Sequence, residues 1–310
     1  MINTLTLNPA IDKILYLDTV EKSMTNRVSD TTKTVGGKGT HVSMNLSEMG
    51  IDSKAFGSVY GDTGRFILNT LQQWGVITRF VFHDRLESRT NYILIENDNT
   101  CTMIAEKGPA LSEEDLRKVI ETMKSEIGNG EFLVLSGDAS NCANPFIYNQ
   151  IIEELNDKQL RIFLDSSGET LLKGLECSPF LVKPNQSELE TLCGFTFTDD
   201  EDVIRGIKSL DSYNIEVVAV SLGKNGAIVR FGREYYRAKP PEVNARNTAG
   251  CGDSFLAALL YGYEKGMTHP EMLKYATAVS SAAAASVLSV GYDKALAAAL
   301  LEKSIVERII

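Results

Sequence analysis

Four runs of apolar residues, each bounded by turn-forming residues, alternate with segments of helical character along most of the chain. The runs are Phe132–Gly137, Arg161–Gly168, Pro179–Asn185 and Glu216–Gly223. Continuous apolar strands of this length are typical of a sheet that is covered on both faces. The helical segments beside them are residues 112–128, 145–158 and 202–214. The first begins with Ser112 three residues before Asp115, a variant of the capping box. This alternation predicts an α/β fold: a three-layer α/β/α sandwich with a mainly parallel central sheet.

Two regions depart from this alternation, because strands with alternating apolar and polar residues follow one another there without a helix. They are Ile11–Val20 with Arg27–Val35, and Arg89–Ile95 with Thr100–Ile104. One polar face in each strand suits a sheet that borders a solvent-filled cleft. We therefore expect a small β-sheet lid, built from about residues 11–35 and 89–104. We expect it to belong to a single domain spanning residues 1–310, because no linker divides the chain.

Composition argues against several classes of function. A formal net charge of −10 disfavours nucleic acid as a partner, although a local site on an acidic protein can still bind a small anion. The sequence has no run of about 18 apolar residues, so we expect no membrane span. The nearest, Ala276–Leu288, is rich in small residues and predicts a closely packed interior helix. Five scattered cysteines and three histidines argue against a disulfide framework or a structural zinc site. With a start unlike a basic-then-apolar leader, they favour the cytoplasm.

The stretch Asn247–Phe255, which reads NTAGCGDSF, places two glycines and an aspartate at the start of an apolar helix. A helix N-terminus attracts anions, and glycine lets the backbone approach a phosphate closely. The amides of Gly250, Cys251 and Gly252 therefore predict an anion cradle beside Asp253, which could act as a general base. An aspartate at this position could equally cap the helix. The spacing fits neither a dinucleotide fingerprint nor a Walker A loop.

Four motifs in order resemble those of the ribokinase-like (PfkB) carbohydrate kinases across essentially the whole chain. They are GGKG at Gly36–Gly39, KPN at Lys183–Asn185 followed by Glu188, SLGKNGA at Ser221–Ala227, and the NTAGCGDSF stretch. The opening TLNPAID and the Asn26-Arg27-Val28 segment look most like the phosphosugar branch, the 1-phosphofructokinases and tagatose-6-phosphate kinases.

The resemblance implies ATP-dependent phosphorylation of a ketohexose monophosphate, fructose 1-phosphate or tagatose 6-phosphate, to the 1,6-bisphosphate. It implies ATP and Mg²⁺ as cofactors, Asp253 as the general base and the Gly250–Gly252 amides as the anion hole. A kinase of an unphosphorylated sugar or nucleoside, or a non-catalytic sugar-phosphate sensor, is the alternative function. A homodimer formed through the lid is a further hypothesis.

The resemblance also implies which residues bind the two substrates. On the sugar side it implies Asp12, Gly36, Gly37, Lys38 and His41, with Arg89 on the substrate phosphate and Arg27 as a second candidate. On the nucleotide side it implies Lys183, Asn185, Ser221, Gly223 and Gly226, with Glu188 holding Mg²⁺ through water. An ordinary turn, a capping role or a solvated charge is the alternative at each position.

Two residues depart from the family pattern. His41 stands where relatives usually have asparagine, and Asp138 lies in SGDASNC, where relatives generally continue with Leu-Pro or similar. Both departures put the identity of the sugar in question more than the type of reaction.

Overall fold

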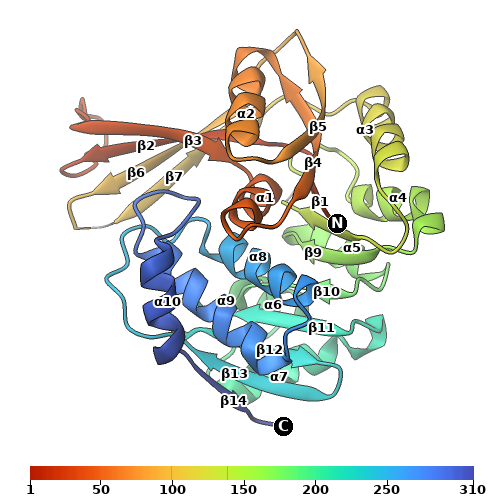
Figure 1. Ribbon diagram of the computed structural model, residues 1–310. Helices are drawn as coiled ribbons and strands as arrows, with labels where there is room; N and C mark the ends of the chain where they lie inside the picture. The colour runs from red at the N-terminus through yellow and green to blue at the C-terminus, as the bar shows by residue number, and fades with distance from the viewer. Residues whose placement is uncertain (99, 138) are drawn as a thin grey trace.

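The computed structural model describes residues 1–98, 100–137 and 139–310, and its central feature is a ten-stranded sheet (Figure 1). One part of this sheet is parallel and runs in the order β5 (Ile77–His83), β4 (Ser53–Tyr60), β1 (Ile2–Thr6), β8 (Phe132–Ser136), β9 (Arg161–Asp165), β10 (Leu181–Val182) and β11 (Val217–Ser221). Antiparallel strands β12 (Ala227–Phe231), β13 (Glu234–Lys239) and β14 (Ile305–Arg308) extend it beyond β11. The predicted mainly parallel sheet is confirmed.

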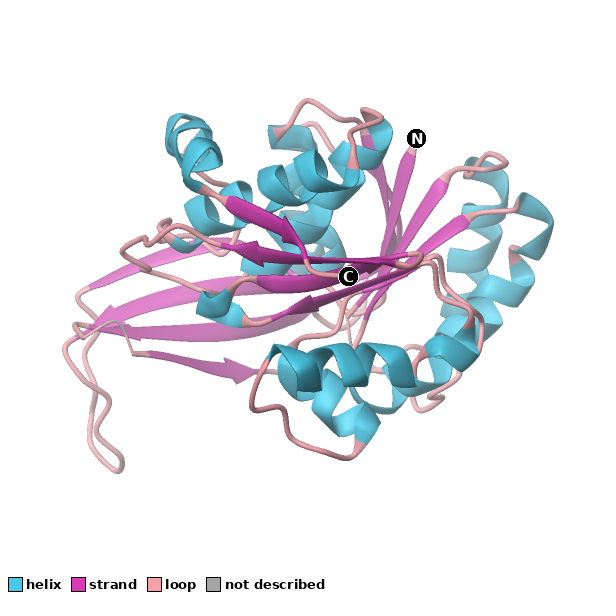
Figure 2. Cartoon of the chain, turned by 90° about the horizontal axis from the view of Figure 1, so that it is seen from below, coloured by secondary structure: helices cyan, strands magenta, loops and turns pink. Residues whose placement is uncertain are grey.

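Helices cover both faces of this sheet, as Figure 2 shows. One face carries α3 (Glu113–Glu126), α4 (Ile147–Glu154), α5 (Gly168–Leu175), α6 (Gln186–Cys193) and α7 (Asp200–Ser209). The other carries α1 (Lys38–Glu48), α2 (Gly61–Gln73), α8 (Cys251–Glu264), α9 (His269–Ala284) and α10 (Lys294–Lys303). The three-layer α/β/α arrangement predicted from the alternation is therefore confirmed.

The core lies on both faces of the parallel strands, because successive side chains of a strand point to opposite sides. In β8, Leu133 and Leu135 pack with the α3–α7 layer, whereas Phe132 and Val134 pack with the α8–α10 layer. All four side chains are buried. Each fully buried side chain of this size contributes roughly 1.5–3 kcal/mol of transfer free energy. Burial on both faces explains why the strands have no polar face in the sequence.

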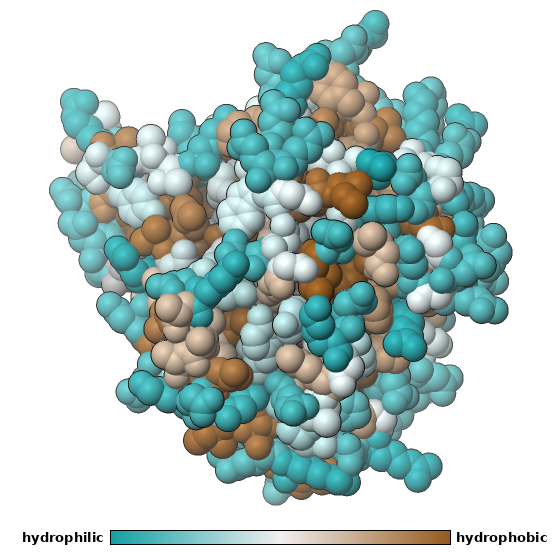
Figure 3. Space-filling model, in the orientation of Figure 1, coloured by the Kyte–Doolittle hydropathy of each residue, from teal (hydrophilic) through white to brown (hydrophobic). Residues whose placement is uncertain are grey.

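A second, four-stranded sheet projects from the core on the left of Figure 1, in the order β3 (Asp30–Gly36), β2 (Ala10–Leu17), β6 (Arg89–Glu96) and β7 (Cys101–Ala105). We call these strands the lid. Strand β6 alternates between buried and half-exposed residues, whereas every residue of β7 is exposed. On this face, Figure 3 shows apolar side chains among polar ones over the lid. Met103 and Ile104 of β7 are among the exposed apolar residues of the lid.

Ser112 accepts a hydrogen bond from the amide of Asp115 at 3.1 Å, so it does begin α3. The run Pro179–Asn185 holds only the two-residue β10, and Pro184, which has no N–H to donate, follows within two residues of its end. Helix α9 is largely buried, as expected of an interior helix, but it ends at Ala284, so residues 285–288 of the predicted helical stretch lie outside it. Among the described residues, no helix is long and apolar enough to span a membrane.

Candidate active site

A cavity of about 520 Å³ lies where the parallel strands end, between the lid and the start of α8. Ligands bind at the carboxyl edge of strands in open α/β sheets. Most of the residues predicted from the motifs line this cavity: Asp12, Gly37, Lys38, His41, Arg89, Lys183, Asn185, Glu188, Ser221, Gly250, Gly252 and Asp253. Another cavity, near Arg161 and Phe180 at the opposite edge of the sheet, contains none of them. Most of the predicted sugar and nucleotide residues thus border the same cavity.

Helix α8 begins at a turn that only glycine fits. Gly250 is the N-cap residue with φ of 79°, and a Cβ there would lie 1.8 Å from the carbonyl oxygen of Ser289. Gly250 and Gly252 line the cavity. Cys251 is not among the lining residues, and its amide points to the carbonyl of Thr248 at 3.4 Å. Its part in the anion cradle therefore stays a prediction.

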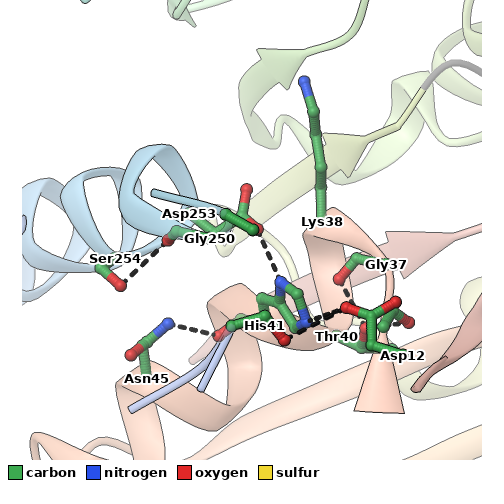
Figure 4. A network of polar contacts seen from close by, with 12 residues as sticks. Asp12, Gly37, Lys38, Thr40, His41, Asn45, Gly250, Asp253 and Ser254 are labelled. Atoms are coloured by element: carbon green, nitrogen blue, oxygen red, sulfur yellow. Dashed lines mark hydrogen bonds and ion pairs between the residues drawn. The ribbon is translucent and has the colours of Figure 1, made fainter. Parts of the chain in front are cut away.

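Asp253 lies in the first turn of α8, but its carboxylate does not cap this helix. It is buried, and its Oδ2 lies 2.8 Å from Nδ1 of His41 on α1 (Figure 4). The N-cap position belongs to Gly250. The carboxylate thus faces the cavity from within a side-chain network, which is the arrangement expected of a group with a chemical role rather than of a cap.

His41 connects three elements of the structure. Its Nδ1 contacts Asp253 of α8, and its Nε2 lies 2.9 Å from the carbonyl oxygen of Val35 in β3 and 3.6 Å from Oδ2 of Asp12 in β2. Burial alone would lower the pKa of His41, but the hydrogen bond and charge of Asp253, with Asp12 and the Val35 carbonyl, raise it to about 9.

Asp12 is held by several donors at the base of the lid. Asn91 of β6 donates to its Oδ1 at 2.8 Å, and Ser289 donates to its Oδ2 at 3.1 Å. Gly36 makes room for it, since a Cβ at that position would lie 2.0 Å from Oδ1. Gly36 therefore supports Asp12 without lining the cavity itself, whereas Gly37 lines it and precedes α1 with φ of 113°.

Asp165, at the end of β9, links two of the predicted lysines. Nζ of Lys38 lies 2.9 Å from its Oδ1, and Nζ of Lys183 lies 3.1 Å from its Oδ2. Burial alone would raise the pKa of Asp165 and lower that of Lys38. The opposite charges outweigh it: Lys183 and Lys38 lower the pKa of Asp165, and Asp165 raises that of Lys38. A Cβ on Gly252 would lie 3.3 Å from Nζ of Lys183, so this ammonium group borders the start of α8.

The two predicted arginines lie in different surroundings. Arg89 lines the cavity at the start of β6, and its Nε donates to the carbonyl of Asn8 at 3.0 Å. Arg27 lies in the exposed segment between β2 and β3, since β3 begins at Asp30 rather than at residue 27. It is not among the residues that line the cavity, so the structure does not bring it to this site.

The predicted nucleotide side begins at α6. Asn185 caps this helix by accepting a hydrogen bond from the amide of Glu188 at 2.9 Å, and the Glu188 carboxylate accepts one from the amide of Asn185 at 2.8 Å. Ser221, the last residue of β11, lines the cavity and pairs with Asn185 in an isolated bridge. Gly223 and Gly226 form the turn between β11 and β12 and do not line the cavity.

A dedicated metal cage is not visible in the described part of the chain, which holds no group of three or more histidine, cysteine or acidic residues that could bind an ion. Mg²⁺ commonly keeps several waters and is held largely by substrate phosphates. The single carboxylate of Glu188, which lines the cavity, fits such an ion through water. Asp138 lies outside the described residues.

Three contributors to the site could not be named from the motifs. Asn91 and Ser289 hold Asp12, and no local signal identifies them. Asp165 ends an apolar strand in DSSG, a stretch that also resembles the phosphosugar branch, but no site role was predicted for it from the sequence.

Comparison with known proteins supplies independent findings. The sequence pattern described as "pfkB family carbohydrate kinase" matches residues 5–291. The chain is 35% identical over 286 residues to a 1-phosphofructokinase of Bacillus subtilis (strain 168), covering 92% of this chain and 93% of that protein. It is 33% identical over 281 residues to a tagatose-6-phosphate kinase of Staphylococcus epidermidis, covering 90% of each. The structure of phosphofructokinase-2 from Escherichia coli in complex with substrates and products has a TM-score of 0.91 at 26% identity, covering 97% of this chain and 98% of that one.

Proposed function

Because the chain belongs to the PfkB family of carbohydrate kinases, and is therefore a phosphotransferase with an alcohol group as acceptor, we propose that it phosphorylates a ketohexose monophosphate with ATP. Fructose 1-phosphate and tagatose 6-phosphate are the two candidate substrates, and each would give a 1,6-bisphosphate. The names of the two relatives at 33–35% identity support both candidates equally.

One observation carries this proposal: a buried carboxylate and the glycine-flanked start of a helix border the same cavity as three cationic side chains. Asp253, Gly250 and Gly252 line the cavity together with Lys38, Lys183 and Arg89. Two phosphorylated substrates bring several negative charges into one site, and cations and helix-start amides stabilise such charges.

In the proposed reaction, Asp253 accepts the proton of the sugar hydroxyl as its oxygen attacks the γ-phosphorus of ATP. The bond between that phosphorus and the bridging oxygen of ADP breaks, and ADP leaves with the electron pair. The amides at Gly250 and Gly252 face the negative charge of the transferring group. General base catalysis of this kind contributes typically about 10²–10⁴-fold in rate. Phosphoryl transfer otherwise depends on positioning and charge stabilisation.

On the nucleotide side, we assign the ATP phosphates to Lys183, Asn185 and Ser221, which line one end of the cavity. Mg²⁺, when bound with ATP, supplies charge neutralisation between the phosphates. Glu188 would hold it through water. The Glu188 carboxylate is positioned for this by its bond to the amide of Asn185.

A kinase of an unphosphorylated sugar is disfavoured by Arg89. A neutral sugar needs no guanidinium group in its pocket, whereas a sugar phosphate is bound well by one. Lys38 adds less to this argument, because its ammonium group already pairs with Asp165.

The deciding experiment is an assay of ADP formation with a panel of fructose 1-phosphate, tagatose 6-phosphate, fructose 6-phosphate, free fructose and free tagatose. We expect turnover with one or both of the first two and none with the free sugars. Turnover restricted to a free sugar would contradict the proposal. Binding of sugar phosphates without ADP formation would support a sensor instead.

The lid also supports the proposal of a homodimer. Strand β7 forms one edge of the lid sheet, and all its residues are exposed, including Met103 and Ile104. Unpaired edges commonly pair with another copy. Light scattering should give twice the mass of one chain, and Ile104→Lys should shift it toward the monomer. A wild-type monomer at working concentration would contradict this.

A further inference from the structure

Both ring nitrogens of His41 face oxygen atoms, and an ionised carboxylate or a carbonyl oxygen can only accept a hydrogen bond. Nδ1 lies 2.8 Å from a carboxylate oxygen of Asp253, and Nε2 lies 2.9 Å from the carbonyl oxygen of Val35. A neutral imidazole carries one N–H and one lone pair, so one of these two contacts would place a lone pair against another. An imidazolium donates from both nitrogens and satisfies both contacts.

We propose that His41 is a positioning residue which, as an imidazolium, holds Oδ2 of Asp253 and so leaves the other carboxylate oxygen for the acceptor hydroxyl. The role rests on the proposed kinase function, whereas the charge state of His41 rests on geometry alone. Figure 4 shows the ring between the carboxylates of Asp253 and Asp12, with Lys38 pointing away from them.

The charged groups that face His41 support the ionised state. Asp253 faces the ring from α8, and Asp12 faces it from β2. Oδ2 of Asp12 lies 3.6 Å from Nε2 of His41. From β3 the Val35 carbonyl contacts the ring. Lys38, on the same helix, pairs with Asp165. Burial raises the pKa of Cys251, at the start of α8, to about 12, so this thiol stays neutral. One buried cation beside two carboxylates is better balanced than an uncharged ring.

The alternative assignment, a neutral His41 beside a protonated Asp253, would leave the proposed base already carrying its proton. It would also leave Asp12 without a counter-charge. An asparagine at this position could donate to Asp253 without carrying charge. Histidine therefore makes the orientation of the base depend on a proton: after deprotonation, the single remaining N–H can serve either Asp253 or Val35.

The charge state is tested by ¹⁵N NMR of the imidazole nitrogens in the full-length free protein at pH 7.5. The chain has three histidines, so His83→Asn and His269→Asn assign the His41 signals by elimination without altering position 41. We expect both nitrogens of His41 to be protonated at pH 7.5 and to titrate near pH 9. One protonated and one unprotonated nitrogen at pH 7.5 would overturn the proposal.

The positioning role is tested by the pH dependence of kcat in wild type, His41→Asn and the control His269→Asn. We expect kcat of wild type and of the control to fall above about pH 9. The His41→Asn enzyme should keep kcat within about tenfold of wild type at pH 7.5, because the asparagine amide can also donate to Asp253, and its kcat should be constant between pH 7 and 9.5. The same alkaline fall in His41→Asn would overturn the role. If no sugar phosphate is turned over, the kinase proposal fails and the role with it, while the NMR result still decides the charge state.

Discussion

Lys38 on α1 and Asp165 at the end of β9 form an ion pair with an N–O distance of 2.9 Å, although 127 positions separate them in the chain. The same carboxylate also pairs with Lys183, which directly follows the neighbouring strand β10, at an N–O distance of 3.1 Å. One buried negative charge thus holds two positive ones, and the group as a whole keeps a net positive charge beside the cavity. Such a charge suits phosphorylated ligands.

We expect Asp165→Asn to reduce the free energy of unfolding by about 3–5 kcal/mol, because Lys183 would remain buried without its counter-charge. Urea unfolding measures this. The control Glu48→Gln breaks the surface pair with Lys294 and should cost no more than about 1 kcal/mol. Equal effects of the two substitutions would show that Asp165 contributes no more than a surface charge.

We expect Asp253→Asn to fold and to lose about 10²–10⁴-fold in kcat, because an amide cannot accept the hydroxyl proton. Steady-state ADP formation gives the loss, and circular dichroism checks the fold. Asp62→Asn, at the exposed start of α2, makes the same chemical change away from the cavity and should leave kcat unchanged. An Asp253→Asn enzyme within tenfold of wild type would exclude Asp253 as the base.

Gly250→Ala and Gly266→Ala compare two glycines that both have positive φ. Gly266 has open space where a Cβ would go, so alanine there should cost only the backbone strain, about 1 kcal/mol. At Gly250 the added Cβ would meet the Ser289 carbonyl at 1.8 Å, so the turn must move. We expect a larger loss of stability and a loss of kcat of at least about tenfold, from displaced amides. Equal costs at both positions would contradict this account.

The stability of the protein should depend on the proton of His41. Its pKa is about 9 in the folded protein against an ordinary value of 6.5. The charged form of His41 therefore stabilises the folded protein fully below pH 6.5, and this stabilisation is lost as the pH rises through 9. The free energy of unfolding of wild type relative to His41→Asn should fall by roughly 3 kcal/mol between pH 6 and 9.5, at about 1.4 kcal/mol per pKa unit. Urea titrations at the two pH values measure it, and a constant difference would contradict the assignment.

Arg89→Gln should raise KM for the sugar phosphate at least about tenfold and leave kcat within a few fold, since a phosphate-binding cation contributes mainly to substrate binding. The control Arg65→Gln removes an exposed arginine of α2 and should change neither constant. A fall in kcat without a change in KM would place Arg89 nearer the transferring group than the substrate's own phosphate.

The elements that could be predicted from the sequence are those whose signal is local. Continuous apolar runs gave the strands β8, β9 and β11, and the glycines around Cys251 marked the start of α8. Strand β14 gave no such signal, since its four residues, Ile305–Arg308, are mostly exposed and become a strand only by pairing with β13.

Within the site, the motif residues could be named but their bonds could not. The Lys38–Asp165 pair depends on the order of β1, β8 and β9 in the sheet, which no local pattern encodes. His41 was recognised as a departure from the family pattern. Its contact with Asp253 depends on the packing of α1 against α8, two helices from opposite ends of the chain.

Strands β1 and β2 are joined by only three residues, at positions 7–9. Asp12 lies on the lid side of this connection, whereas Asp253 belongs to a helix packed on the central sheet. The distance between the two carboxylates therefore depends on the angle between the lid sheet and the central sheet, and not on either sheet alone. In the proposed mechanism, substitutions at Leu7, Asn8 or Pro9 would therefore act on catalysis geometrically, by displacing Asp12 relative to Asp253 while both carboxylates stay intact.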